Sequence, residues 1–298
     1  MIGLIAGKSG DSLTDELHKR GYSVAIVCGK DNEPGVDKAD TSLVADLSRH
    51  EEIYDFFSSH SICKVIFGTG HRLAFDLAEY LISKGFLVNI DVEKSSMAKD
   101  KWRFKKALNS INVNTPQAVI INSVNECERI ETFGFPCVVK SVIDTVLPCK
   151  VDNVFELREA IAEVLKTKSQ AFVEKYIDGN DCTVMVASDG YTVRNYGVTY
   201  YSKAKEYKLR GFNNAHSNRM TSKEERKVCE IAEKIVCQLQ FKGLVRVDFI
   251  ISDEVYVLEL NSVIVTGYTG SAYPFFEKGG INVASLAIDT ALSILNEK

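Results

Sequence analysis

The chain has 298 residues, of which 45% are hydrophobic and 26% charged, and its formal net charge is −4. These values are typical of a globular protein with room for two or three domains. Acidic and basic residues are interspersed without a basic stripe, which argues against a nucleic-acid partner. No apolar run approaches the roughly 20 residues that span a bilayer. Eight cysteines without a CxxC pair fit a reducing compartment, so we expect a cytoplasmic protein with no membrane contact.

The first ninety or so residues alternate apolar strands with helices, which predicts a parallel, doubly wound sheet. The predicted strands are residues 1–6, 23–28, 63–68 and 86–90. Glycine-containing turns, Gly7–Gly10 and Gly68–His71, follow the first and third of these strands. The spacing in the first turn does not match a P-loop. Both turns lie at the carboxyl ends of strands, where open α/β sheets bind ligands, and a plain tight turn is the alternative.

Two further units are predicted after this first domain of residues 1–95. Residues 96–180 show a β-α-β-β-α-β rhythm, which favours a small α+β lobe. Residues 181–298 are predicted to form a second α+β lobe. Its polar stretch 202–218 is longer than most loops in compact domains, which indicates a lid with a function. Residues 222–240 have the apolar spacing of a helix with one buried face.

Near the C-terminus, two apolar runs flank a short polar turn and predict a β-hairpin. Polar residues lie two apart in each run, Arg246 and Asp248 in the first and Glu259 and Asn261 in the second. Side chains two apart share one face of a strand, and burying these four without partners would cost several kcal/mol. Two carboxylates and an amide oxygen suit a hard cation such as Mg²⁺, and the arginine suits an anion. A structural ion-pair network is an equally open interpretation.

Short motifs follow one another in order from about Lys99 to the C-terminus. They are D-K-x-R-x-x-K at 100–106, F-P-x-V-V-K at 135–140, V-E-K-Y-I-x-G at 173–179, a loop with A-K at 204–205, R-V-D at 246–248, L-E-x-N at 258–261 and G-Y-T-x-S-x-x-P at 267–274. Each motif is weak alone, but together they resemble the ATP-grasp superfamily, and closely its D-alanine–D-alanine ligase-like branch. The resemblance implies an ATP-grasp fold, in which a Rossmann-like N-terminal domain precedes two α+β lobes that clamp ATP.

The resemblance also implies roles for individual residues. The nucleotide would be contacted at its phosphates, adenine and ribose, in chain order, by Lys101, Lys140, Glu174, Lys175, Tyr176, Ile177 and Asp181. Two Mg²⁺ ions, with Mn²⁺ as an alternative, would be held by Asp248, Glu259 and Asn261. Three residues would act on the reacting groups: Lys205 over the γ-phosphate, Arg246 at the reacting carboxylate and Ser271 at a substrate carboxylate.

The implied reaction is ATP-dependent ligation of a small carboxylate to an amine through an acyl phosphate, with release of ADP and phosphate. Catalysis would consist mostly of positioning and charge neutralisation. The loop after Lys140 lacks glycine, the segment after Asn261 lacks the expected proline, and the N-terminal turn lacks a glutamate for D-alanine. These departures favour substrates other than D-alanine.

Two alternatives to a ligase remain open. The first is an enzyme of the same fold that makes an acyl or carboxy phosphate for another nucleophile, and the second is a nucleotide-binding protein without catalysis. The substrates are not identified by these motifs. A homodimer is common among such relatives and is kept as an expectation.

Overall fold

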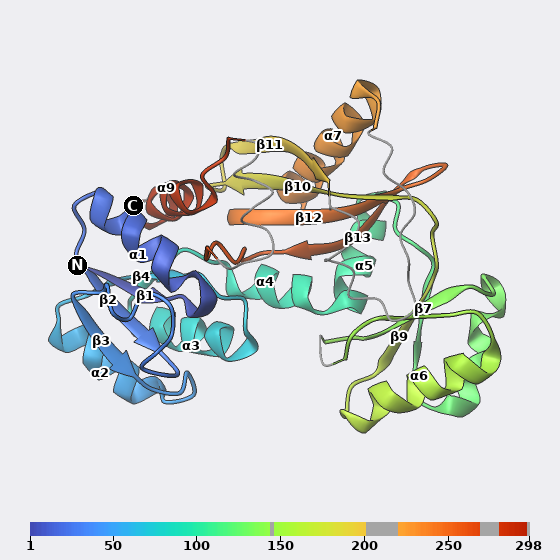
Figure 1. The fold of residues 1–298 in the computed structure, drawn as a ribbon, viewed down its shortest axis with the longest axis horizontal. Helices are drawn as coiled ribbons and strands as arrows, with labels where there is room; N and C mark the ends of the chain where they lie inside the picture. The colour runs from blue at the N-terminus through green and yellow to red at the C-terminus, as the bar shows by residue number, and fades with distance from the viewer. Residues whose placement is uncertain (144–145, 201–219, 269–279, 297–298) are drawn as a thin grey trace.

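The computed structural model describes residues 1–143, 146–200, 220–268 and 280–296, and its described strands form three sheets. Figure 1 shows the N-terminal sheet at one end of the molecule and the small lobe with β7 and β9 at the other. The third sheet lies between them, with α4 and α5 beneath it. No helix among these residues is long and apolar enough to cross a membrane.

The N-terminal sheet is parallel throughout, with the strand order β3-β2-β1-β4-β5. Its strands are β1 (Ile2–Ile5), β2 (Val24–Cys28), β3 (Thr41–Val44), β4 (Lys64–Phe67) and β5 (Leu87–Val88). The short η1 (Gly7–Ser9) and the helices α1 (Gly10–Lys19), α2 (His50–Ser59) and α3 (Arg72–Ser83) connect them. Every residue of β1 and β2 is buried, as expected for strands covered on both faces. The predicted doubly wound sheet is confirmed, whereas β3 and α2 were not predicted.

The small lobe is a four-stranded antiparallel sheet in the order β6-β9-β7-β8. Its elements are β6 (Ala118–Ile121), η2 (Val124–Thr132), β7 (Cys137–Ser141), β8 (Cys149–Val151), α6 (Val154–Lys166) and β9 (Ala171–Lys175). The helices cover one face, where Val139 of β7 and Val173 of β9 join a core with Leu157 and Ile161 of α6. Alternate residues of the same strands therefore point to the other face.

The third sheet is antiparallel in the order β11-β10-β12-β13. Its elements are β10 (Asn180–Ser188), β11 (Val193–Tyr200), α7 (Ser222–Gln238), β12 (Gly243–Ile251) and β13 (Val255–Asn261). The apolar face of α7 packs on β10 and β11 through residues such as Val228, Ala232 and Ile235, which confirms the predicted amphipathic helix. Thr221 and Glu224 cap its start reciprocally.

Two helices join the N-terminal sheet to the lobes: α4 (Val92–Lys99) and α5 (Lys101–Ser110). Asp100 caps α5, because its side chain accepts hydrogen bonds from the backbone of Trp102 (3.0 Å) and Arg103 (2.9 Å). Phe104 and Leu108 belong to the core beneath the third sheet, whereas Trp102 packs against the small lobe. Helix α5 therefore contacts both lobes.

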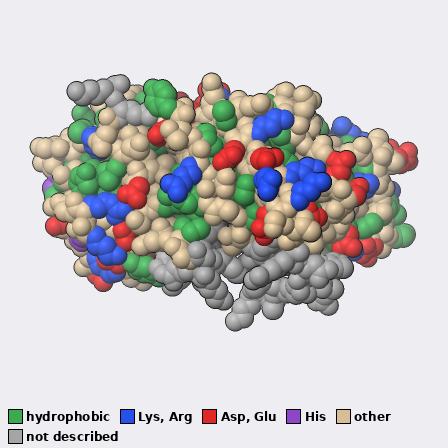
Figure 2. Space-filling view, turned by 90° about the horizontal axis from the view of Figure 1, so that it is seen from above, with side chains coloured by type: hydrophobic (Ala, Val, Ile, Leu, Met, Phe, Trp, Pro, Cys, Tyr) green, Lys and Arg blue, Asp and Glu red, His purple; other side chains and the backbone are tan. Residues whose placement is uncertain are grey.

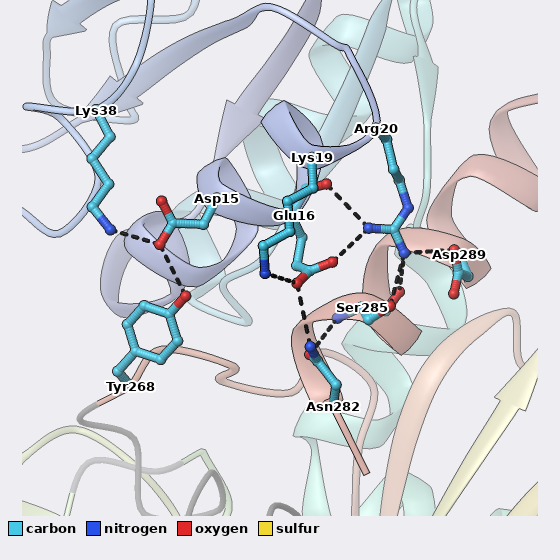
Figure 3. A network of polar contacts seen from close by, with 9 residues as sticks. All are labelled: Asp15, Glu16, Lys19, Arg20, Lys38, Tyr268, Asn282, Ser285 and Asp289. Carbon is cyan, nitrogen blue, oxygen red and sulfur yellow. Dashed lines mark hydrogen bonds and ion pairs between the residues drawn. The ribbon is translucent and has the colours of Figure 1, made fainter.

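The C-terminal helix α9 (Val283–Asn296) returns to the start of the chain and packs beside α1 (Figure 1). Figure 3 shows the polar network at this junction. Buried Glu16 of α1 accepts hydrogen bonds from Lys19 (2.7 Å), Arg20 (2.6 Å) and Asn282 (3.2 Å). Arg20 also reaches Asp289 at 2.8 Å. These contacts attach the last described helix to the N-terminal sheet.

Candidate active site

The face of the small-lobe sheet opposite α6 carries an ion pair with little exposure to solvent. Lys140 and Glu174 alternate with the core residues of β7 and β9, so both point away from α6. In the antiparallel register Lys140 lies opposite Phe172 and Glu174 lies opposite Val138, which makes the two charged residues diagonal neighbours. The Lys140 ammonium contacts Glu174 Oε1. The sequence prediction that placed both residues at one site is consistent with this geometry, and their roles toward a nucleotide stay a prediction.

A second lysine, which the sequence motifs did not single out, completes this cluster. Lys105 Nζ of α5 lies 3.6 Å from Glu174 Oε2, and the Lys105 side chain is buried. Burial alone would raise the pKa of Glu174, but the ammonium groups of Lys140 and Lys105 hold that pKa below its ordinary value. The sequence feature that could have indicated Lys105 as a site residue is its i, i+4 spacing from Lys101, which places both lysines on one face of the helix.

The second half of the site is the predicted hairpin of β12 and β13. Arg246 is paired with Asn261 and Asp248 with Glu259, so all four side chains share one face, as predicted. The register shifts just after Asp248, because Phe249 pairs with Val257, and a β-bulge of this kind re-aims the neighbouring side chains. Arg246 Nη2 lies 3.0 Å from Asp248 Oδ2, and Asn261 Nδ2 lies 3.2 Å from Glu259 Oε1.

The pKa values of the two carboxylates on this face are shifted in opposite directions. Burial and the nearby charge of Glu259 raise the pKa of Asp248, although Arg246 acts in the opposite direction. For Glu259, the ammonium groups of Lys101 and Lys140 outweigh burial and lower the pKa. Lys101 also lowers the pKa of Glu174. Lys101 is therefore within electrostatic reach of both halves of the site, so the two halves lie near each other.

The donor chemistry of the hairpin fits the Mg²⁺ that the sequence predicted. Asp248 and Glu259 are adjacent, and Asn261 Nδ2 donates to Asp248 Oδ2 at 3.4 Å and to Glu259 Oε1 at 3.2 Å. The ligands that these residues can offer are the carboxylate oxygens and the amide oxygen of Asn261, as hard divalent cations prefer. The charge of Glu259 raises the pKa of Asp248, and a bound cation would offset this repulsion. Among the described residues no group of three or more His, Cys, Asp or Glu side chains forms another metal site.

The residues predicted to bind the adenine and the ribose lie in and beside the connection between β9 and β10. Lys175 ends β9, Tyr176 and Ile177 follow it, and Asp181 lies in β10. The Tyr176 backbone N–H donates to Pro136 O at 3.1 Å, which ties this connection to the strand before Lys140. The connection lies close to the third sheet, because a Cβ at Gly179 would come within 2.3 Å of a β12 carbonyl oxygen. Lys205 and Ser271, the remaining predicted residues, lie outside the described residues.

Charged side chains elsewhere are mixed in sign. On the face shown in Figure 2, basic and acidic groups are interspersed and form no patch of a single sign. That face therefore offers no electrostatic footprint for a nucleic acid.

Comparison with known proteins agrees with this geometry. A family model described as the D-ala D-ala ligase C-terminus matches residues 111–289. The carbamoyl phosphate synthase large chain of Thermoanaerobacter sp. (strain X514) is 25% identical over 251 residues, which cover 81% of this chain and 23% of the relative. The chain thus spans about a quarter of the length of the curated relatives that it matches.

Solved structures share the whole described fold. The L-amino acid ligase from Bacillus licheniformis matches with a TM-score of 0.76 at 18% identity, covering 98% of this chain and 73% of that chain. The biotin carboxylase domain dimer of Hydrogenobacter thermophilus 2-oxoglutarate carboxylase, in complex with MgADP, ADP and bicarbonate, matches with a TM-score of 0.80 at 18% identity, covering 100% and 70%. Because the family model covers more than half of the chain, this protein belongs to the D-ala D-ala ligase C-terminus family and has the ATP-grasp fold.

Proposed function

We propose that this protein is an ATP-dependent carboxylate–amine ligase that forms an acyl phosphate and releases ADP and phosphate. The observation that carries the proposal is the proximity of two unlike clusters. The lysines around Glu174 lie near the hairpin carboxylates, since Lys101 and Lys140 both act electrostatically on Glu259. A polyphosphate needs both a set of cations and a site for its divalent counter-ion.

In the proposed reaction each group has a chemical task. Lys101 and Lys140 bind the phosphates, while Glu174 and the β9–β10 connection position the base. Asp248, Glu259 and Asn261 would hold Mg²⁺, which when bound neutralises charge on the phosphates. The guanidinium of Arg246 binds the substrate carboxylate and steadies its charge as its oxygen attacks the γ-phosphorus. The amine then attacks the acyl carbon, and phosphate leaves.

The substrates are the finer part of the proposal. The family relation and the L-amino acid ligase neighbour support amino acids or other small carboxylates joined to an amine. The similarity to carbamoyl phosphate synthase and biotin carboxylase supports a second candidate, in which a carboxy or acyl phosphate is made for another nucleophile. The complete carboxylate and arginine set of the hairpin argues against a nucleotide-binding protein without catalysis. A homodimer, as in the biotin carboxylase neighbour, is part of the proposal.

Phosphate release from Mg-ATP tests the reaction. Amino acids and small carboxylates are supplied alone and in pairs, with the wild type beside Glu259→Gln and Asp253→Asn. Asp253 lies on the exposed turn of the same hairpin, so its variant controls for the loss of one charge there. Release that requires a pair, survives in Asp253→Asn and is lost in Glu259→Gln supports the ligase. Release with one carboxylate alone favours the second candidate, and absence of release with every combination contradicts both.

A further inference from the structure

Lys105 occupies an unusual place for a lysine. Its helix, α5, lies between the lobes, and the Lys105 side chain points to the small lobe, where it is 8% exposed. The ammonium donates to Thr115 Oγ1 at 2.7 Å and to the Pro116 carbonyl oxygen. It also lies 5.5 Å from the centroid of the Phe172 ring. Burying a strongly hydrated ammonium in such a setting has a large desolvation cost. A nearby group of opposite charge is therefore expected to offset that cost.

The compensation is Glu174, whose two carboxylate oxygens face two different lysines. Oε1 contacts Lys140, and Oε2 lies 3.6 Å from Lys105. The two cations are not equivalent. The side chain of Lys140 is 13% exposed and that of Lys105 is 8% exposed, and Lys105 is held by hydrogen bonds to the 115–116 segment. Lys105 is thus the fixed partner of Glu174.

Nucleotide binding, as proposed above, changes this balance. If Lys140 turns to a phosphate, Glu174 loses its closest cation while it is only 3% exposed. A buried carboxylate left without a partner costs several kcal/mol, and this cost would be subtracted from the affinity for the nucleotide. Lys105 does not need to move in order to keep the carboxylate paired.

We propose that Lys105 is a positioning residue that holds Glu174 ionised and in place, and so frees Lys140 to bind the phosphates of a nucleotide. The inference rests on the proposed function, because it assumes that the site binds a nucleotide. It assigns Lys105 no contact with the reacting atoms. Its contribution is to the affinity for the nucleotide.

The proposal has a pH signature. Burial lowers the pKa of Lys105 to about 8, with Glu174 of β9 raising it and Lys140 of β7 lowering it further. Lys101, on the same helix as Lys105, acts on Glu174 as well. Above pH 8 Lys105 loses its proton, Glu174 depends more on Lys140, and the nucleotide must compete harder for that lysine. The affinity for the nucleotide should therefore fall between pH 7.5 and pH 9.5.

Calorimetric titration of the full chain with MgADP at pH 7.5, 8.5 and 9.5 tests this. Four proteins are compared: the wild type, Lys105→Gln, Lys105→Arg and the control Lys106→Gln. Lys106 is the next residue of the same helix and is exposed, so its variant loses the same charge without touching Glu174. Circular dichroism establishes that each variant is folded.

At pH 7.5 we expect Lys105→Gln to bind MgADP about tenfold more weakly than the wild type, which corresponds to about 1.4 kcal/mol. Its affinity should change less with pH than that of the wild type. Lys105→Arg, which stays charged, should recover the affinity and keep it at pH 9.5 if it folds, and Lys106→Gln should follow the wild type. Wild-type affinity and pH dependence in Lys105→Gln would overturn the inference. Failure of the wild type to bind MgADP would instead overturn the proposed function and the inference with it.

Discussion

Replacing Lys105 by methionine should change how the stability of the ligand-free protein depends on pH. Methionine has a similar length and no charge, so the variant keeps the packing beside Phe172 and removes the buried ammonium. The pKa of Lys105 is about 8 in the folded protein, against an ordinary value of 10.5, mainly because of burial. Between these two values the unfolded chain binds more protons than the folded one, so the free energy of unfolding rises with pH.

The size of the effect follows from the two pKa values. Below pH 8 Lys105 is protonated in both states and adds no slope, and above pH 10.5 it is neutral in both. Integrated from pH 7 to pH 10, the single proton adds about 2–3 kcal/mol to the free energy of unfolding of the wild type. The methionine variant lacks this term but shares the other ionisable groups. The difference in free energy of unfolding, wild type minus variant, should therefore increase by that amount.

Urea unfolding of both proteins at pH 7, 8, 9 and 10, at constant ionic strength, measures this difference. The difference should stay nearly constant from pH 7 to pH 8 and then increase at up to about 1.4 kcal/mol per pH unit. A difference that does not change with pH would show that Lys105 titrates alike in the folded and unfolded chain. In that case its burial against Glu174 could not have the electrostatic consequence described here.

Four further variants test other parts of the structure. A Cβ at Gly267 would lie 1.8 Å from the Lys8 carbonyl oxygen, so Gly267→Ala should lower the free energy of unfolding by about 2–3 kcal/mol. Gly85 has a positive φ but open space around it, so Gly85→Ala should lower the free energy of unfolding by only about 1 kcal/mol. Glu16→Gln should lower the free energy of unfolding by about 1–3 kcal/mol in urea unfolding at pH 7. Because the partners of Glu16 lower its pKa despite burial, the difference in free energy of unfolding between wild type and variant should shrink as pH falls through that pKa. Asp248→Asn should remove most of the gain in ADP affinity that Mg²⁺ gives the wild type, measured as the ratio of the two dissociation constants.

The half of the site on the hairpin could be predicted because side chains two residues apart on a strand point to the same face. Side chains at 246 and 248 must share a face, and so must those at 259 and 261. The short turn between the strands brings both pairs together, and the structure confirms that they lie on one face. The bulge after Asp248 could not be predicted, because it depends on how the two strands fit over the core.

The sequence motifs missed Lys105, because its burial depends on packing between elements that are far apart in the chain. One face of α5 packs beneath the third sheet through Phe104 and Leu108, and the Lys105 side chain points at the small lobe. A helix with buried residues on two sides has no simple apolar period, so its buried lysine looks like an ordinary surface residue in the sequence. Only the packing of α5 against the small lobe places Glu174 beside it.

The elements that were not predicted are those with little buried surface. In β3 no residue is fully buried, and α2 buries only Ile53 and Phe57. β8 has three residues and lies at the edge of its sheet. Such segments are stabilised by a neighbouring strand or helix rather than by their own pattern. The docking of α9 on α1 is likewise a contact between the two ends of the chain.

The charges of the site explain how a protein with a net charge of −4 would bind a polyanion in the proposed function. Cations and anions nearly balance there: the cationic side chains are Lys101, Lys105, Lys140 and Arg246, and the anionic ones are Glu174, Asp248 and Glu259. Pairing each buried charge with an opposite neighbour offsets part of its desolvation cost. In the proposed function, an entering nucleotide takes Lys140 from Glu174 and brings several negative charges. Lys105 compensates the carboxylate, and a divalent cation at Asp248 and Glu259 compensates the phosphates, so nucleotide and cation should bind cooperatively.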